Sequence, residues 1–579
     1  MKRSALLGMT LILVGCGGNG GSFVGSGGSS SASGLASTIF SGARKQVPSG
    51  TSNLVLNGAV IPAGKNQLLV VVNEDASEDQ VAILLNLISN LGAQVVGDAP
   101  ESFVLQLGFP DGSDLVAAIA ALEANAAVDE VTVNQTINAD AMPAPVDPTP
   151  ATFDGNFWVD HINAKLGWGF FNRNGASPRI GVVDGGFDYD QNAFVASRIV
   201  AVVDSENRPL TARDTDGPIK HGTIVSAFAA GDGGGNTANP TVGVCWNSPL
   251  YEVKGLGDAQ TGFVFDGILG AETALNQGCR WVTLSLGPDA PKNPTSEQSF
   301  YGPEEEFRSG FLNVLDLAAR KDAILCFATG NDGEGNMGQF RPKNDNRFLP
   351  ATSRASDRPF RTHAMITGAT NSNKAMASFS REGQVLTLAA PGEQVGVGRP
   401  LANKLLHDGC SYANPLTAGS GAALMNINPD LMAIEARQIL IETASATITQ
   451  QVGNLRMLDF GTAATEANRL TGVARSPELT FNLPAGANEA GAVDVSAPAS
   501  GGPVTLSLDI LGDSQSFVTI SPASFAAVPA GETRTFQISL KRANLASNRA
   551  LSYPLMFWGR SAGQVVKRVP LRVNIPEQS

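Results

Sequence analysis

Four polar residues spread along the middle of the chain are of the types that together activate a serine hydroxyl: Asp184, His221, Asn331 and Ser411. A serine attacks a carbonyl carbon when a neutral imidazole removes its proton and a carboxylate orients that imidazole. A side-chain amide stabilises the oxyanion that results. Each residue alone is explained more simply as a cap, a turn or a core residue, so it is their combination that predicts nucleophilic catalysis.

The segments around these residues predict how the fold brings them together. Asp184 ends an apolar run, and Asn331 comes shortly after another. Continuous apolar runs, which suit strands covered on both faces, occupy 180–183, 250–253, 281–286 and 323–327, and helical patterns lie between them at 223–230, 266–276 and 304–321. His221 and Ser411 each fall just before a helix. Because ligands bind at the carboxyl ends of parallel strands, we expect all four residues to meet at one rim of a parallel α/β sheet.

The order Asp, His, Asn, Ser and the motifs around it resemble the subtilisin-like serine proteases. The matching runs are 180–184, 221–223, 242–245, 250–254, 285–287, 328–331, 377–380, 388–392 and 409–415. The resemblance implies a catalytic triad of Asp184, His221 and Ser411, with Asn331 in the oxyanion hole. It also implies that substrate is bound by Ser285, Leu286, Gly287, Ala328, Thr329 and Gly330. The implied enzyme is a serine endopeptidase that hydrolyses polypeptides through an acyl-enzyme and requires no cofactor for its chemistry.

The chain departs from the family pattern at four positions. Gly185 stands where the family usually has Thr or Ser, and Cys410 where it has Thr. Tyr412 stands where the family usually has a small residue or Met, and Leu416 where it has His. None of these changes removes a group that transfers a proton or stabilises charge. An alternative from another class is an inactive surface adhesion or binding lipoprotein with a protease-like domain. An esterase of the α/β-hydrolase type is excluded, because the segment 409–413 lacks the last glycine of Gly-x-Ser-x-Gly.

Residues 61–140 predict a small domain in front of the catalytic one. Apolar residues at helical spacing predict a helix over 78–91 with Ser77 as its N-cap, and a second helix over 113–126. Strand patterns occupy 68–72, 94–96, 103–107 and 128–137. The order β-α-β-β-α-β predicts a ferredoxin-like α+β fold. By position and pattern the domain resembles the family's propeptide, which acts as an intramolecular inhibitor, and the Pro-rich stretch 141–150 is expected to be an extended linker.

The start of the chain predicts export. Lys2-Arg3 and the short apolar stretch 5–14 are typical of a signal peptide, covering residues 1–16. It ends in Leu-Val-Gly-Cys16, which resembles the lipobox of bacterial lipoproteins, whereas an ordinary secretory signal remains the alternative. A Gly/Ser-rich tether then covers 17–60. We expect lipidation of Cys16 to anchor the protein to the membrane of the bacterial cell envelope, and cleavage of the linker to release the mature enzyme, unless the propeptide-like domain stays bound.

The rest of the sequence completes the domain plan. We expect the peptidase domain over 151–471, and the alternating polar and apolar segments of 476–579 predict a C-terminal β-sandwich. A formal charge of −13 without basic clusters argues against nucleic acid as a partner. Four cysteines follow Cys16, and we expect buried free thiols, with a Cys245–Cys279 bridge as the alternative. No metal site is readable, since 214–217 resembles a calcium loop only loosely, although family members can carry structural calcium.

Overall fold

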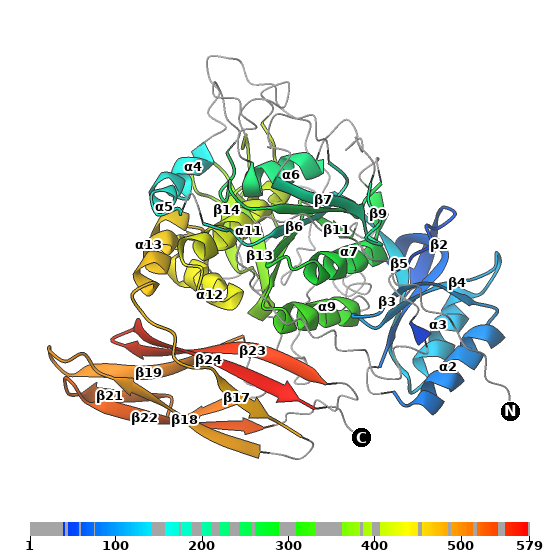
Figure 1. The fold of residues 1–579 in the computed structure, drawn as a ribbon. Helices are drawn as coiled ribbons and strands as arrows, with labels where there is room; N and C mark the ends of the chain where they lie inside the picture. Colours follow the sequence, from blue (N-terminus) through cyan, green and yellow to red (C-terminus); the bar gives the residue numbers. More distant parts are fainter. Residues whose placement is uncertain are drawn as a thin grey trace, which may run out of the picture.

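The structure is a computed structural model. It describes residues 39–40, 44–56, 59–73, 76–139, 157–172, 175–187, 198–210, 221–231, 242–257, 261–288, 308–331, 362–381, 386–396, 406–449, 454–484, 488–512, 518–541 and 550–576. Figure 1 shows three parts: an N-terminal domain in blue and cyan, a central domain from cyan to yellow, and a C-terminal domain in orange and red. The first and the last both pack against the central domain.

The central domain is built on a nine-stranded sheet in the order β15-β16-β14-β13-β12-β10-β6-β8-β7. All neighbouring strands pair in parallel except β15 with β16. The strands are β6 (Ile180–Asp184), β7 (Ile199–Asp204), β8 (Leu250–Lys254), β10 (Trp281–Leu284), β12 (Ile324–Ala328), β13 (Ala364–Thr370), β14 (Leu388–Pro391), β15 (Ser445–Thr449) and β16 (Asn454–Met457). The predicted parallel α/β architecture is therefore confirmed.

Helices cover both faces of this sheet, which explains why its strands are apolar throughout. One core cluster contains α7 (Val264–Asn276) and α9 (Arg308–Arg320) together with Leu325 and Phe327 of β12. The cluster on the opposite face contains the neighbouring residues Ile324 and Cys326. The helices packed there are α6 (His221–Ala230), α11 (Cys410–Ile427), α12 (Ala433–Thr443) and α13 (Phe460–Leu470), and the short helices α4 (Phe157–His161) and α5 (Ala164–Trp168) lie beside them. Successive side chains of a strand point to opposite faces, so each face receives its own apolar set.

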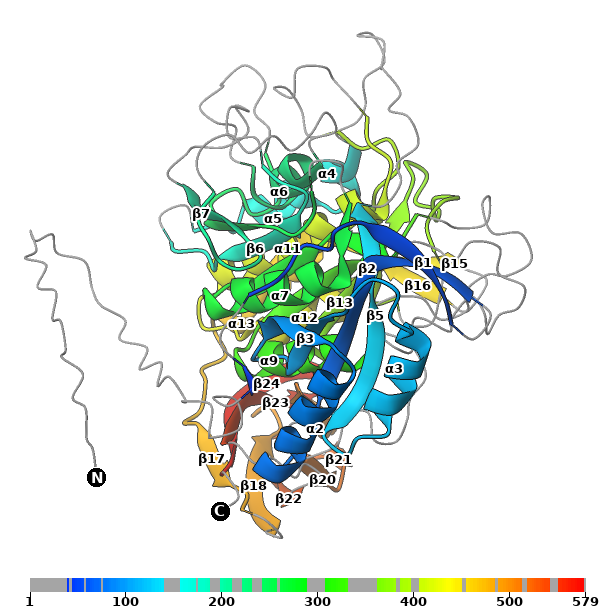
Figure 2. The ribbon, with the colours of Figure 1, turned by 90° about the vertical axis from the view of Figure 1, so that its right-hand side faces the viewer.

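The N-terminal domain has the predicted ferredoxin-like order. Its sheet runs β5-β2-β4-β3, and an additional strand β1 pairs with β2. The elements are β1 (Thr51–Leu56), β2 (Ala59–Val72), α2 (Glu78–Asn90), β3 (Gln94–Ala99), β4 (Val104–Gly108), α3 (Leu115–Glu123) and β5 (Val128–Ala139). Ser77 forms a capping box with Gln80 at the start of α2, as its sequence position predicts. Figure 2 shows α2 and α3 together on one side of this sheet, with β5 running up toward the central domain.

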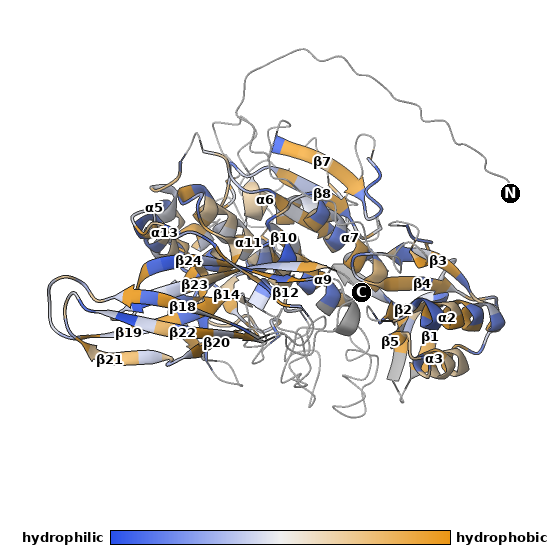
Figure 3. Cartoon of the chain, turned by 60° about the horizontal axis from the view of Figure 1, so that its bottom comes forward, coloured by the Kyte–Doolittle hydropathy of each residue, from blue (hydrophilic) through white to orange (hydrophobic). Residues whose placement is uncertain are grey.

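The C-terminal domain is the predicted β-sandwich. A five-stranded sheet has the order β17-β24-β23-β19-β21, and a three-stranded sheet has the order β18-β22-β20. The strands are β17 (Leu479–Asn482), β18 (Asn488–Ser496), β19 (Val504–Leu511), β20 (Val518–Ser521), β21 (Ser524–Val528), β22 (Thr533–Lys541), β23 (Leu551–Ser561) and β24 (Gln564–Ile575). Figure 3 shows orange and blue alternating along several of them. Three of these strands were not predicted from the sequence: β18, β21 and β23.

Several sequence predictions concern residues that the structure does not describe. Cys16, the linker 141–150 and the segment 214–217 are among them. Within the described ranges, no helix is both long and apolar enough to cross a membrane. The same ranges contain no group of three or more His, Cys, Asp or Glu side chains arranged to hold a metal ion.

Candidate active site

Asp184 and His221 form a buried hydrogen-bonded pair at the end of the central strand β6. His221 Nδ1 lies 2.7 Å from Asp184 Oδ1, and neither side chain is exposed. The backbone N–H of Gly185 donates a second hydrogen bond to the same carboxylate oxygen, at 2.7 Å. A carboxylate on Nδ1 fixes the imidazole tautomer and makes Nε2 the atom that can accept a proton. The pair thus has the arrangement of a general base held by a carboxylate.

The glycine that follows His221 explains part of the local motif. A Cβ atom added at Gly222 would lie 2.3 Å from the carbonyl oxygen of Gly186 and 3.0 Å from Asp184 Cβ. The first turn of α6 can therefore approach the end of β6 only because this position lacks a side chain. His221 is the first residue of α6 and Ser411 the second of α11. Both lie inside the first turn of a helix, whereas the sequence placed them just before one.

Ser411 is buried at the start of α11 and is joined to Ser285. Its hydroxyl donates a hydrogen bond to the carbonyl oxygen of Ser285, with an O–O distance of 3.2 Å. In the opposite direction, Ser285 Oγ donates to the carbonyl oxygen of Ser411 at 2.9 Å. The N-terminal end of a helix carries partial positive charge, which favours negative charge nearby. Ser411 therefore lies where a developing oxyanion would be stabilised.

Asn331 lies next to Ser411 with its amide in a defined orientation. Its Oδ1 accepts a hydrogen bond of 2.8 Å from the backbone N–H of Cys410. This contact leaves Nδ2 as the free end of the amide. Nδ2 is buried and has no hydrogen-bond acceptor within the part of the chain that the structure describes. A buried donor without an acceptor is costly, so this atom is available to an oxygen that arrives with a ligand.

Two of the predicted substrate-binding residues pair with the N-terminal domain. Leu286 and Gly287 of β11 (Leu286–Pro288) lie opposite Ala139 and Asn138 in an antiparallel ladder. On its other side, the end of β5 pairs with β9 (Thr261–Phe263). The C-terminal end of β5 is therefore an extended segment held between two strands of the central domain. Its pairing has the geometry of strand addition, in which an extended segment hydrogen-bonds to the edge of a strand.

The other predicted substrate-binding residues pack behind the start of α11. Ala328 ends β12, and the backbone N–H of Thr329 donates to Thr367 O at 3.2 Å. The carbonyl oxygen of Gly330 accepts a contact of 3.2 Å from Cys410 Sγ. Thus 328–330 lies beside α11, while Leu286 and Gly287 pair with β5.

Sequence reasoning missed an aromatic stack beside the candidate base. The ring of Tyr412 lies 5.7 Å from the His221 ring and 5.1 Å from the His407 ring, measured between centroids. Burial and, to a smaller extent, the proximity of His221 lower the pKa of His407 to about 4. His407 is therefore neutral at physiological pH and adds no positive charge next to His221. The contact of His407 with Tyr412, the residue after Ser411, corresponds to no recognisable motif in the sequence.

Asn414 lies within the matching run 409–415, but the sequence did not indicate its role. Its Nδ2 donates to Thr283 Oγ1 at 2.9 Å and to the carbonyl oxygen of Cys326 at 3.0 Å. It thereby joins the first turns of α11 to the ends of β10 and β12. Such contacts fix the helix that carries Ser411 relative to the sheet.

The described cysteines are all buried free thiols. This confirms the expectation from the sequence, and the alternative Cys245–Cys279 bridge is not formed. Burial raises the pKa of Cys245 and that of Cys279 to about 12 each, so both are unreactive thiols at neutral pH.

The chain belongs to the subtilase family, whose sequence model matches residues 175–472. The alkaline protease of Alkalihalobacillus alcalophilus is 30% identical over 226 residues, covering 39% of this chain and 50% of that protein. The M-protease of Shouchella clausii is 29% identical over 247 residues, covering 43% and 54%. Subtilisin Savinase of Lederbergia lenta is 30% identical over 226 residues, covering 39% and 70%. The chain thus spans about half the length of the first two relatives.

Among solved structures, the epidermin leader peptide processing serine protease of Staphylococcus aureus aligns with 69% of this chain and 98% of its own. The sequence identity is 16% and the TM-score is 0.49.

Proposed function

We propose that the chain is a serine endopeptidase that cleaves polypeptides through Asp184, His221 and Ser411. The observation that carries this proposal is the buried Asp184–His221 pair at the same sheet rim as Ser411. In the proposed reaction, Ser411 Oγ attacks the peptide carbonyl carbon while His221 takes its proton. His221 then gives that proton to the leaving amine, and water hydrolyses the acyl-enzyme.

The hydroxyl of Ser411 must turn during this reaction. A hydroxyl has one proton to donate, and that of Ser411 is directed to Ser285 O. Catalytic hydrogen bonds commonly form only when substrate is bound. In the proposed mechanism, substrate binding rotates the hydroxyl away from Ser285 toward His221.

The oxyanion is stabilised by two donors in this proposal. Asn331 Nδ2 is one, because its oxygen end is held by Cys410 and its nitrogen end is unused in the described part of the chain. The backbone N–H of Ser411, at the start of α11, is the other. Donors fixed before the reaction stabilise the transition state without reorganisation.

The N-terminal domain acts in this proposal as an intramolecular inhibitor, so that the enzyme is made as a zymogen. Support comes from the end of β5, which pairs with β9 and β11 as an extended peptide. Asp184, His221 and Ser411 are also fully buried in this form. A substrate can reach them only after this segment has left.

Export and membrane anchoring are part of the same proposal and are supported by the start of the sequence. The signal-like residues 1–16 end in Cys16, whose lipidation would attach the chain to a bacterial membrane. Metabolic labelling with a fatty-acid analogue, comparing the wild type with Cys16→Ala, tests this step independently of catalysis. An unlabelled wild-type protein would leave an ordinary secretory signal as the explanation.

A serine-directed fluorophosphonate probe tests the enzymatic proposal. The matured protein should be labelled and should hydrolyse a protein substrate, and Ser411→Ala should abolish both. Ser496→Ala is the control, because Ser496 lies exposed on β18 of the C-terminal domain and this variant should still be labelled. Absence of labelling in a processed, folded protein would instead favour the inactive binding lipoprotein.

A further inference from the structure

Helix α9 is contacted by the N-terminal and the C-terminal domain at once. In Figure 1 it lies at the lower edge of the central domain, with β23 of the C-terminal domain beneath it and β3 of the N-terminal domain beside it. Figure 2 shows the same neighbours from another side. One core cluster contains apolar residues of all three domains, among them Val71 and Val104 of the N-terminal domain, Phe311 and Leu315 of α9, and Phe557 of β23. The two outer domains therefore share the core to which α9 belongs.

The N-terminal domain reaches α9 through the turn before β4. Asn313 Nδ2 donates to the carbonyl oxygen of Ser102 at 2.8 Å. Arg320 Nη2 lies 3.7 Å from Glu101 Oε2, which is within ion-pair distance. Asn313 and Arg320 are separated by about two helical turns and so lie on the same side of α9. The turn 101–102 is thus held at two points along one face of the helix.

The C-terminal domain reaches the same face of α9 through a tyrosine. Tyr553 of β23 donates its phenol O–H to Asp316 Oδ1 at 2.5 Å, and both residues are buried. Asp316 follows Asn313 by three residues and precedes Arg320 by four. Side chains at these spacings are neighbours on a helix. The contacts of the two outer domains therefore meet within two turns of one helix.

Asp316 joins the two sets of contacts. Its Oδ2 accepts a hydrogen bond of 2.9 Å from Arg320 Nε, while its Oδ1 accepts the one from Tyr553. A guanidinium group is planar and holds its N–H groups in a fixed fork. Because Nε is fixed on Asp316, the direction in which Nη2 points toward Glu101 is fixed as well. The result is a polar chain from one outer domain to the other: Tyr553, Asp316, Arg320 and Glu101.

Water screens the middle of this polar chain only weakly. The exposed fractions of the Arg320 and Asp316 side chains are 14% and 3%. Charges interact more strongly in such surroundings than in bulk water, and hydrogen bonds to an ionised group are stronger than neutral ones. Glu101, at the end of the chain, is 40% exposed. Its contribution therefore depends on how well Arg320 is oriented toward it.

We propose that the C-terminal β-sandwich strengthens the attachment of the N-terminal domain by fixing the orientation of Arg320 through Tyr553 and Asp316. Such coupling is reciprocal, so the N-terminal domain also strengthens the attachment of the β-sandwich. The biological consequence rests on the proposed zymogen: a change that loosens the β-sandwich favours opening of the N-terminal domain and exposure of Ser411. The C-terminal domain thereby regulates the active site without touching it.

The test is hydrogen exchange, read by mass spectrometry, on the uncut chain with Ser411→Ala. Tyr553→Phe removes one hydroxyl and keeps the ring. Peptides that cover 99–104 in the N-terminal domain should then exchange at least about fivefold faster, the lower end of the usual coupling between two sites. Ser552→Ala is the matched control on the same strand, because Ser552 Oγ donates to Asn574 Oδ1 within the C-terminal domain. It should change this exchange rate less than about twofold.

A second variant shows whether the polar chain carries the effect. Glu101→Gln removes the charge that Arg320 meets, so adding Tyr553→Phe to it should accelerate exchange at 99–104 little further. Exchange of β24 is measured in parallel and reports whether Tyr553→Phe loosens the β-sandwich as a whole. If it does, Asp316→Asn decides, because this change interrupts the polar chain within the central domain and should accelerate the same peptides.

Two outcomes would overturn the proposal. One is an unchanged exchange rate at 99–104 in Tyr553→Phe or, where β24 is loosened, in Asp316→Asn. The other is full acceleration by Tyr553→Phe in the Glu101→Gln background. These measurements need no catalysis. A protein that fails to react with the fluorophosphonate probe can therefore still show the coupling, and a protein that reacts can still lack it.

Discussion

Ser285 and Ser411 are linked by two hydrogen bonds that run in opposite directions, each from the side chain of one to the backbone carbonyl of the other. This double link attaches the start of α11 to the residue that directly precedes β11. Because β11 also pairs with β5, the position of the candidate nucleophile relative to the end of β5 is fixed by the ladder register.

The register predicts which bond is cut during maturation. Ala139 is opposite Leu286, the residue that directly follows Ser285, and Asn138 is opposite Gly287. Ser285 O is 3.2 Å from Ser411 Oγ, which predicts cleavage after Asp140. N-terminal sequencing of the mature enzyme should therefore begin at Ala141.

The control for this prediction is Ser411→Ala, which should remain uncut when produced alone. A mature chain that begins several residues further along the linker would contradict the register, because the peptide would then have to slide along β11.

Asn331→Ala should lower kcat by about 10²–10³, the range known when a subtilisin loses its oxyanion-hole asparagine. KM should change little, because the donor acts mainly on the transition state. The reason is the orientation of Asn331, whose Oδ1 is held by Cys410 N–H while Nδ2 is left for the oxyanion. Steady-state kinetics on a peptide substrate measure both constants. Asn468→Ala, on the exposed face of α13, is the control, and an equal loss in that variant would point to a general defect.

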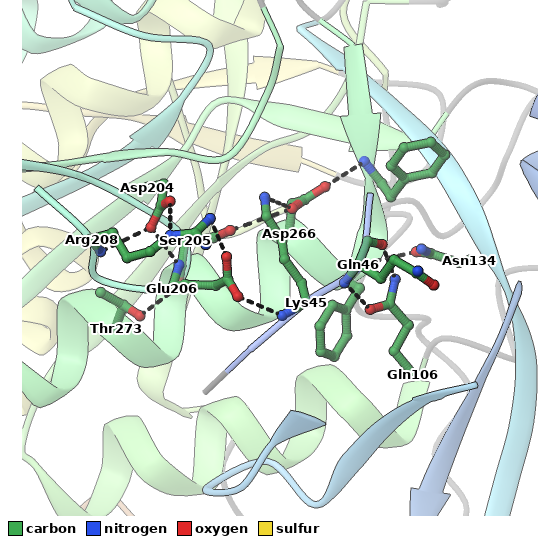
Figure 4. A network of polar contacts seen from close by, with 12 residues as sticks. Lys45, Gln46, Gln106, Asn134, Asp204, Ser205, Glu206, Arg208, Asp266 and Thr273 are labelled. Atoms are coloured by element: carbon green, nitrogen blue, oxygen red, sulfur yellow. Dashed lines mark hydrogen bonds and ion pairs between the residues drawn. The ribbon is translucent and has the colours of Figure 1, made fainter. Parts of the chain in front are cut away.

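The sequence predicted those features that depend on local patterns. The continuous apolar runs identified the parallel strands because both faces of the sheet are covered, and Ser77 identified the start of α2 because a capping box is a local interaction. The contact between the rings of His407 and Tyr412 could not be predicted, because it depends on how the loop before α11 packs. The ion pair of Lys45 with Asp266 (Figure 4) could not be predicted for the same reason, because the two residues are far apart in sequence and meet only across two domains.

Removal of Arg568 should destabilise the protein strongly. Its guanidinium binds Glu435 of α12 through Nε at 2.8 Å and Nη2 at 2.7 Å, and both side chains are buried. This pair joins the C-terminal domain to the central domain. Arg568→Ala leaves Glu435 as a buried charge without its cation, which typically costs about 3–5 kcal/mol. Urea unfolding measures the loss in the Ser411→Ala background.

The matched control is Arg572→Ala. Arg572 pairs with Glu478 on the surface, with exposed fractions of 40% and 37%, and exposed pairs contribute at most about 1 kcal/mol. Equal losses in the two variants would mean that burial of the Arg568 pair has no special role in holding the domains together.

The affinity of the N-terminal domain for the central domain should fall as the pH rises toward 7. Glu272 of α7 accepts a hydrogen bond of 2.9 Å from Ser102 Oγ. Burial under the N-terminal domain and, to a smaller extent, the nearby Glu101 raise the pKa of Glu272 to about 7. Once the domain has left, the carboxyl group meets water and its pKa returns toward the ordinary value near 4.5.

The direction of the pH dependence follows from this difference in the pKa of Glu272. The complex binds the proton more tightly than the separated pieces, so association is strongest below the pKa of the free group and weakens until the pH passes about 7. When the 141–150 stretch of the Ser411→Ala chain is cut by a foreign protease, dissociation of the two pieces should therefore be more than tenfold faster at pH 8 than at pH 5. Glu272→Gln cannot ionise and should remove most of this dependence. If the variant keeps the full dependence, Glu272 is not the group whose ionisation weakens the association.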